Sequence, residues 1–365
     1  MSLHDNNSTG FRYLWVVRCS GSRINSNLEY KIIPEAPGRN ITPLIEVIDE
    51  EISTPFRIAL RRKYHRVFIE FPAYLNEQGN KFRAKPDTTL RDYTNCIDFF
   101  NAISLGPDIP VVSAFHDPRD IAIDYSLESM LVDGMPNGSG EVAVRIRVPT
   151  VNLSSSTNSL NSYNYLLEIL RGRGSLFLDI FNMSRGFVQT TSNLRLMCTL
   201  ARALNIPVFV LNAFEPRDMA HNYGPFFSKH LDLEGFGDFA TEFRFPQNVR
   251  INRPYSDIRK TIRLYDWNRF VLRDFSQYTY AAAVSQLTTS RLWINNGAHI
   301  SSCPACRNVS LGVFNESRSY WKSFRIQHYL HCMANETCAN YLASSNAEDM
   351  DPDGYDTFFS SGGTG

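Results

Sequence analysis

The amino-acid sequence predicts an α/β fold: an eight-stranded parallel (βα)8 barrel, similar to a TIM barrel, with an α+β module appended after it. Eight apolar runs of strand length recur between residues 11 and 245, and helix-sized stretches separate most of them. This alternation favours a parallel sheet, because parallel strands need crossover connections. The span fits a closed barrel of eight units. An open doubly wound sheet is the alternative, but no Gly-x-Gly-x-x-Gly follows any of the runs.

The eight runs are rich in Val, Ile, Leu and Phe, as expected of strands buried between helices. They are FRYLWVV (11–17), ITPLIEV (41–47), RVFIEF (66–71), PVVSAF (110–115), VAVRIRV (142–148), SLFLDIF (175–181), PVFVLNAF (207–214) and TEFRF (241–245). Helical spacing of apolar residues predicts helices over 54–63, 89–103, 160–170 and 193–204. The spacers at 21–39 and after the seventh run are less regular.

Two stretches, IPVVSAFHDPRDIA (109–122) and IPVFVLNAFEPRDMA (206–220), are nearly the same. In each, a strand ends at Ala-Phe and a proline follows at the first position of the next helix. We interpret them as equivalent strand-to-helix corners of one barrel. A sharper alternative places Arg119 and Arg217 at the barrel mouth as paired contacts for an anion.

The predicted domain boundaries follow from where this alternation of strands and helices begins and ends. They are a flexible N-terminus (1–10), the barrel (11–247), the C-terminal α+β module (248–340) and a disordered tail rich in Ser, Gly and Asp (341–365). In the module, 255–275 reads as strands around a turn at 266–268, and 279–292 reads as a helix.

The composition excludes several classes of protein. Lys and Arg total 37 and so do Asp and Glu, so no global basic field attracts nucleic acid or membrane. The apolar runs are too short to span a membrane, and the polar N-terminus is no signal peptide. Seven cysteines without disulfide-framework spacing favour a reducing, cytoplasmic location.

Charged and polar side chains at the predicted strand ends are the candidates for a site, because barrel catalytic faces lie where strands end. The candidate catalytic residues are Glu46, Glu70, His116 and Asp179, and the candidate ligand-binding residues are Arg18, Arg145, Arg147, Asn212 and Arg244. Carboxylates suit Mg²⁺ or Mn²⁺, guanidiniums bind phosphate, and an imidazole can act as general acid or base. The alternative is an internal ion-pair network that fills the barrel mouth.

A second candidate site is a Cys-x-x-Cys with downstream Cys and His residues. Its predicted ligands for a structural Zn²⁺ are Cys303, Cys306, His331 and Cys332. His328 lies three residues before His331, a spacing that suits one face of a helix. The alternative interpretation is a buried core thiol beside hydrogen-bonded histidines.

Several segments resemble the "beta protein" family of bacteria and phages. ITPLIEV (41–47), PVVS (110–113), VAVRIRV (142–148) and FLDIF (177–181) resemble its signature strands, and SYWKSFRIQHYLHCM (319–333) resembles its closing Trp–Arg–Ile–His block. The resemblance implies a cytoplasmic protein with a role in phage defence or in the control of a toxic partner. It implies no established reaction, so Glu46, Arg145 and Asp179 are matching positions without an assigned role.

Two functions therefore stay open from the sequence. One is a binding or regulatory protein whose barrel mouth takes a phosphate-bearing ligand, such as a nucleotide or nucleic acid, or a protein partner encoded nearby. The other is a metal-dependent phosphodiesterase or nuclease that uses the strand-end carboxylates.

Overall fold

The computed structural model describes residues 12–19, 40–47, 50–64, 66–70, 108–114, 141–148, 153, 157–181, 187–212, 231, 233–240, 259–266, 271–295 and 297–334. The predicted helix at 89–103, the two Pro-Arg-Asp corners, the N-terminus (1–10) and the tail (341–365) lie outside these residues. The chain divides into two compact units. The barrel strands belong to the first unit, and the elements from residue 259 onward belong to the second.

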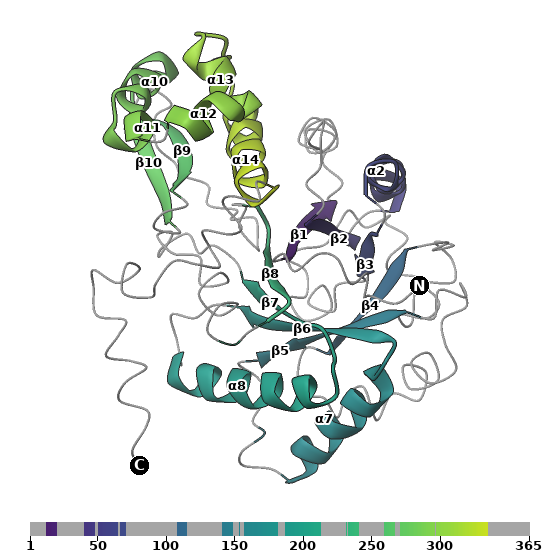
Figure 1. Ribbon diagram of the computed structural model, residues 1–365. Coiled ribbons are helices and arrows are strands. Elements are labelled where there is room, and N and C mark those ends of the chain that lie inside the picture. The colour runs from purple at the N-terminus through teal and green to yellow at the C-terminus, as the bar shows by residue number, and fades with distance from the viewer. Residues whose placement is uncertain are drawn as a thin grey trace, which may run out of the picture. The chain divides into compact units, whose positions relative to one another are not determined.

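Eight parallel strands, β1 to β8, close into a barrel in chain order, which confirms the predicted architecture (Figure 1). The strands are β1 (Arg12–Cys19), β2 (Ile41–Val47), β3 (Phe68–Glu70), β4 (Ile109–Ala114), β5 (Val142–Arg147), β6 (Gly174–Phe181), β7 (Val208–Asn212) and β8 (Gly235–Asp238). The barrel closes where β8 pairs with β1, with Phe236 opposite Tyr13. Seven of the eight apolar runs in the sequence correspond to barrel strands.

The strand that closes the barrel is not the predicted eighth run, since that run (241–245) lies outside the described residues. The strand that closes the barrel is β8, whose sequence GFGD lacks the apolar run expected of a strand. Glycine is depleted in strands generally, so sequence pattern alone hides this one. Here the glycines are needed for packing, since a Cβ on Gly237 would lie 2.6 Å from the Cβ of Leu14 and 2.7 Å from the backbone oxygen of Leu14.

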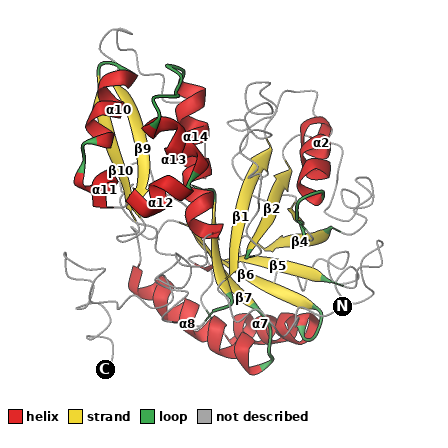
Figure 2. Cartoon of the chain, turned by 45° about the horizontal axis from the view of Figure 1, so that its top comes forward, coloured by secondary structure: helices red, strands yellow, loops and turns green. Residues whose placement is uncertain are grey.

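Three helices of the barrel unit are described, and they pack on its strands (Figure 2). Helix α2 (Glu50–Arg61) follows β2 and packs on it, α7 (Thr157–Leu170) precedes β6, and α8 (Phe187–Ala203) joins β6 to β7. All three overlap predicted helices. The outer face of β1 meets this layer, because the ring of Trp15 stands edge-on to Phe56 of α2 at 6.5 Å.

A buried carboxylate fixes the end of α2 to the start of β4. Asp108, directly before β4, accepts hydrogen bonds from Arg61 and forms an ion pair with Arg57 at 3.5 Å. Burial raises the pKa of Asp108, while the two arginines act to lower it. This contact lies at the amino-terminal end of β4, the end of a barrel where polar residues serve stability.

The described part of the second unit contains an antiparallel hairpin and five helices. The strands are β9 (Lys260–Asp266) and β10 (Val271–Gln277), and they confirm the two strands predicted within 255–275. The helices are α10 (Tyr280–Thr288), α11 (Arg291–Asn295), α12 (Gly297–Ser302), α13 (Pro304–Ser310) and α14 (Arg318–Ala334). Helix α10 begins at Thr279, whose side chain accepts a hydrogen bond from the backbone N–H of Ala282.

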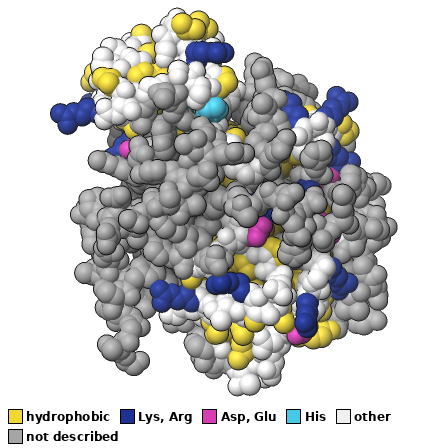
Figure 3. Space-filling view, viewed as in Figure 1, with side chains coloured by type: hydrophobic (Ala, Val, Ile, Leu, Met, Phe, Trp, Pro, Cys, Tyr) yellow, Lys and Arg dark blue, Asp and Glu magenta, His cyan; other side chains and the backbone are white. Residues whose placement is uncertain are grey.

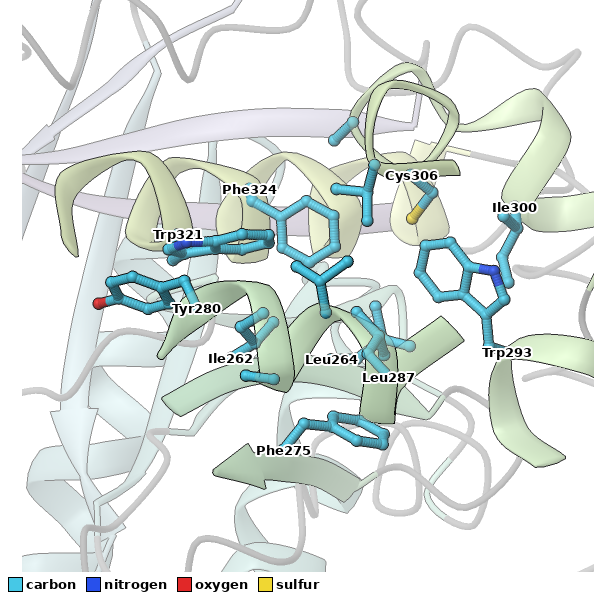
Figure 4. Close-up of a cluster of buried hydrophobic side chains, with 14 of the residues drawn as sticks. Ile262, Leu264, Phe275, Tyr280, Leu287, Trp293, Ile300, Cys306, Trp321 and Phe324 are labelled. Atoms are coloured by element: carbon cyan, nitrogen blue, oxygen red, sulfur yellow. The ribbon is translucent and has the colours of Figure 1, made fainter. Parts of the chain in front are cut away.

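This unit has its own hydrophobic core (Figure 4), in which side chains of the hairpin meet those of the helices. Trp321 of α14 is its centre: its ring stacks on Tyr280 at 5.6 Å and stands edge-on to Phe324 at 5.4 Å. Ile262 and Leu264 of β9 are fully or almost fully buried in the same cluster. Among the described helices of the chain, none has both the length and the apolar character needed to cross a membrane.

Candidate functional site

The first candidate site lies inside the barrel, close to the carboxyl ends of the strands. We call this end of the barrel the barrel mouth. Strand register places Glu46 beside Glu70, and Arg145 between Ser113 and Phe177. Side chains alternate along a strand, so these positions share one face of the sheet. That face is the interior, because Arg145 on β5 contacts Glu46 on β2, and those two strands are not neighbours in the barrel.

The guanidinium of Arg145 joins three carboxylates from three other strands. Its Nη1 donates to Glu46 Oε1 at 2.9 Å and to Glu70 Oε2 at 2.5 Å. Its Nη2 and Nε both donate to Asp179 Oδ2, at 2.8 and 3.0 Å. Both edges of the planar guanidinium are therefore used, which is the geometry that distinguishes arginine from lysine.

This cluster, which we call the Arg145 network, is withdrawn from solvent. Arg145 and Asp179 are each 1% exposed, and Glu46 and Glu70 are fully buried. Burial alone lowers the pKa of Arg145, but attraction by Glu70, Asp179 and Glu46 outweighs this and raises that pKa well above its ordinary value. Arg145 is therefore a permanent buried cation, and removal of any charge here leaves others without compensation.

Aromatic rings line the same inner face of the strands, at the inward-facing positions two residues before the acids of the network. Phe68 lies two residues before Glu70, and Phe177 lies two residues before Asp179. The ring of Phe177 stands edge-on to Phe68 at 5.0 Å and to Phe209 of β7 at 5.7 Å. These rings provide an apolar floor, so the charges above them interact in a medium of low polarity.

The remaining mouth residues predicted from the sequence are placed less completely. Arg147 follows Arg145 on the same face of β5, is only half-buried, and pairs in register with Asp179. Asn212 is buried at the last position of β7. Arg18 pairs in register with Glu46, and its side chain is outside the described set. His116 and Arg244 lie outside the described residues.

Sequence reasoning missed a further buried acid of the barrel, Asp238. The hydroxyl of Tyr13 donates to Asp238 Oδ1 at 2.6 Å, and both residues are fully buried. Strand alternation puts them on the outer face with Trp15, away from the Arg145 network. The pair stabilises the β1–β8 closure, and it was missed because β8 itself was not recognised.

The second candidate site is a cluster of Cys303, Cys306 and His328 in the C-terminal unit, which we call the Cys–His cluster. One ligand atom from each of the three residues lies within 4.8 Å of the others, so the cluster could hold a metal ion. Cys303 directly precedes α13, Cys306 lies in its first turn, and His328 projects from α14. All three are fully buried.

Electrostatics at this cluster favour one thiolate. A hydrogen bond from Cys306 lowers the pKa of Cys303 to about 4; burial opposes this shift, and a hydrogen bond to His328 supports it. The same Cys303 contact, together with burial, raises the pKa of Cys306 well above its ordinary value. Cys306 therefore keeps the proton and Cys303 carries the charge. A thiolate is the form in which cysteine binds metal.

The histidine that lies in the cluster is not the one predicted as a ligand. His328, not His331, lies with the two cysteines, while His331 Nε2 lies 3.2 Å from the Ser302 hydroxyl. The reason is helix geometry, because His331 is turned away from the fully buried face of α14 and is only half-buried. Cys332, also predicted as a ligand, is not one of the three residues of the cluster: it is buried one turn after His328, and its Sγ lies 3.7 Å from His328 Nε2.

The surface carries no comparable concentration of charge on the face seen in Figure 3, as far as the described residues show. Lys and Arg side chains are scattered singly there, with acidic side chains between them. Comparison with family models, with characterised proteins and with solved structures finds no match. Function must therefore be argued from the two clusters.

Proposed function

We propose that the barrel is a binding module that takes a phosphate-bearing ligand at its mouth and does not hydrolyse it. The observation that supports this is the Arg145 network. A guanidinium lies between Glu46, Glu70 and Asp179, in the place where a divalent cation would have to bind. In this arrangement one oxygen of each carboxylate is bonded to Arg145, so the carboxylates organise the barrel interior around that cation.

Arg147 is the residue that we assign to the ligand. It lies one step further along the inner face of β5 than Arg145, toward the mouth, and it is only half-buried. A guanidinium at the carboxyl end of a barrel strand is well placed to bind phosphate oxygens through two parallel hydrogen bonds. The buried network beneath it holds β5 in place and so orients Arg147.

The proposed biological setting comes from the family resemblance. A cytoplasmic binding module suits phage defence or the control of a toxic partner, in which recognition rather than turnover is the task. A protein encoded nearby is the second proposed occupant of the mouth. It would compete with small phosphate-bearing ligands for the same face.

Metal-dependent phosphodiester cleavage is the second candidate function. It is favoured by one observation, the convergence of three carboxylates from three strands inside the barrel near its mouth. Mg²⁺ or Mn²⁺ held by the same carboxylate oxygens would have to displace the guanidinium of Arg145. The first proposal needs no such rearrangement.

We also propose that the Cys–His cluster binds a structural Zn²⁺. Two buried thiols and a buried imidazole are ligands that zinc favours, and their complete burial favours a structural role over a catalytic one. The metal would join the start of α13 to the middle of α14. Metal analysis of the purified protein tests this, with about one zinc per chain expected.

The binding proposal is tested by isothermal titration of phosphate, pyrophosphate, mononucleotides and short DNA and RNA. Arg147→Met should weaken binding of the ligand found by about tenfold or more, because a hydrogen bond to a charged group is worth roughly 1.5–3 kcal/mol. Arg171→Met is the matched control: Arg171 is 62% exposed and lies before β6, at the other end of the barrel from the mouth. Equal affinities in both variants would contradict the assignment.

A further inference from the structure

We infer that the metal at the Cys–His cluster is bound through His328 Nδ1, and that this binding is coupled to the packing of the β9–β10 hairpin against α14 through the carbonyl of Tyr265. The inference rests on the proposed zinc site. It adds a specific ring nitrogen, a second residue that supports the ligand, and a structural consequence of metal binding.

The two nitrogens of the His328 ring face different partners. Nδ1 lies 3.2 Å from the Sγ of Cys306, on the metal side. Nε2 lies 3.1 Å from the backbone oxygen of Tyr265, which is in β9. A carbonyl oxygen only accepts hydrogen bonds, so Nε2 carries the proton and donates it. In the neutral ring Nδ1 then has a free electron pair, which is the state that a metal ligand needs.

This arrangement is the one by which proteins orient histidine ligands. A metal-binding histidine generally donates its other N–H to a carboxylate or a backbone carbonyl, which fixes the tautomer and the ring orientation. Packing reinforces the hydrogen bond here. The ring of Phe324 stacks on His328 with an interplanar angle of 9°, and the ring of Tyr265 stands edge-on to Tyr329 at 4.6 Å.

Three segments distant in sequence therefore meet at one imidazole. His328 is 22 residues from Cys306 and 63 residues from Tyr265. A metal bound to the electron pair of Nδ1 keeps the ring proton on Nε2 and so favours the hydrogen bond to β9. Loss of the metal releases this constraint, because the proton can then move to Nδ1 and leave the Tyr265 carbonyl without a donor.

A thiol–disulfide function for Cys303 and Cys306 fits the structure less well. Exchange requires that a thiolate reach the sulfur of another molecule. Both cysteines are fully buried within the core of the unit, Cys306 among the side chains shown in Figure 4. Closed metal coordination needs no such access.

The tautomer is tested by NMR of the full chain with ¹⁵N-labelled histidine, loaded with zinc. The chain has eight histidines, and His328→Ala identifies the signal of interest. We expect a metal-bound Nδ1 and a protonated Nε2 whose hydrogen exchanges slowly with water. A metal-bound Nε2 with a protonated Nδ1 would overturn the inference even if zinc is present.

The coupling is tested by hydrogen exchange with and without a chelator. Removing zinc should speed amide exchange in both β9 and α14 by about tenfold or more, because a bound metal stabilises the closed state against opening. His328→Ala should show the fast rates with or without the chelator. His331→Ala, on the same helix but outside the cluster, should keep the slow rates and the zinc.

The outcomes separate the two proposals. Stoichiometric zinc with unchanged exchange in β9 after chelation would overturn the coupling and leave the zinc site intact. A chain that binds no zinc at all would overturn both. If His328→Ala does not fold, the wild-type tautomer and the wild-type response to chelator still decide the matter.

Discussion

Replacing Arg145 by Met removes the cation that joins the three buried carboxylates, and it tests the network most severely. Breaking a buried ion pair by removing one partner costs about 3–5 kcal/mol. A second route gives a similar figure: a carboxylate left without its cation can take up a proton. At pH 7 this costs about 4 kcal/mol, because the ordinary pKa lies about three units lower and each unit is worth about 1.36 kcal/mol. We therefore expect Arg145→Met to lower the free energy of unfolding of the barrel by about 4 kcal/mol at pH 7.

The same reasoning sets a pH dependence. Protonation costs less at lower pH, so the penalty of Arg145→Met relative to wild type should shrink to roughly half by pH 5.5. Hydrogen exchange of peptides from β5 measures the stability of the barrel separately from that of the second unit. Arg171→Met, which removes an exposed arginine, should cost less than about 0.5 kcal/mol. A penalty for Arg145→Met below about 1 kcal/mol at pH 7 would refute the account of the network.

Three further predictions concern other parts of the chain. Gly237→Ala should destabilise the barrel by about 1–3 kcal/mol through overpacking, whereas Gly297→Ala, where a Cβ meets nothing within 4 Å, should be near neutral in the same denaturation assay. Burial raises the pKa of Cys198 to about 12, so iodoacetamide at pH 8 should leave this thiol unlabelled in native protein and label it after unfolding, as read by peptide mapping. Cys303→Ser should weaken zinc binding and His331→Ala should not, because Cys303 belongs to the Cys–His cluster whereas His331 lies beside Ser302; equal affinities by competition with a chelator dye would contradict this.

The barrel was predictable from sequence because seven of its strands are continuous apolar runs, which is what strands covered by helices require. The eighth was not, since β8 is built around Gly235 and Gly237, and their value lies in close approach to β1 rather than in hydrophobicity. The repeated Arg in VAVRIRV indicated two inward-facing arginines. That Arg145 would be enclosed by Glu46, Glu70 and Asp179 depends on strand order and stagger, which no local pattern reports.

For the Cys–His cluster too, local sequence pattern predicted only part of the site. The Cys-x-x-Cys pattern identified both cysteines, and the spacing of the histidines predicted a helix correctly. Choosing between His328 and His331 required knowing which face of α14 is buried. That face is set by Trp321, Phe324 and the hairpin, all of which are tertiary contacts.

The measurement that tests the central claim most directly is turnover of a generic phosphodiester and of short DNA and RNA, with and without Mn²⁺, by wild type and by Asp179→Asn. If Arg145, rather than a metal, is the cation that joins the three carboxylates, neither protein will cleave any of these substrates under either condition. Cleavage by wild type that depends on Mn²⁺ and is lost in Asp179→Asn would contradict the account. The barrel mouth would then be an active site.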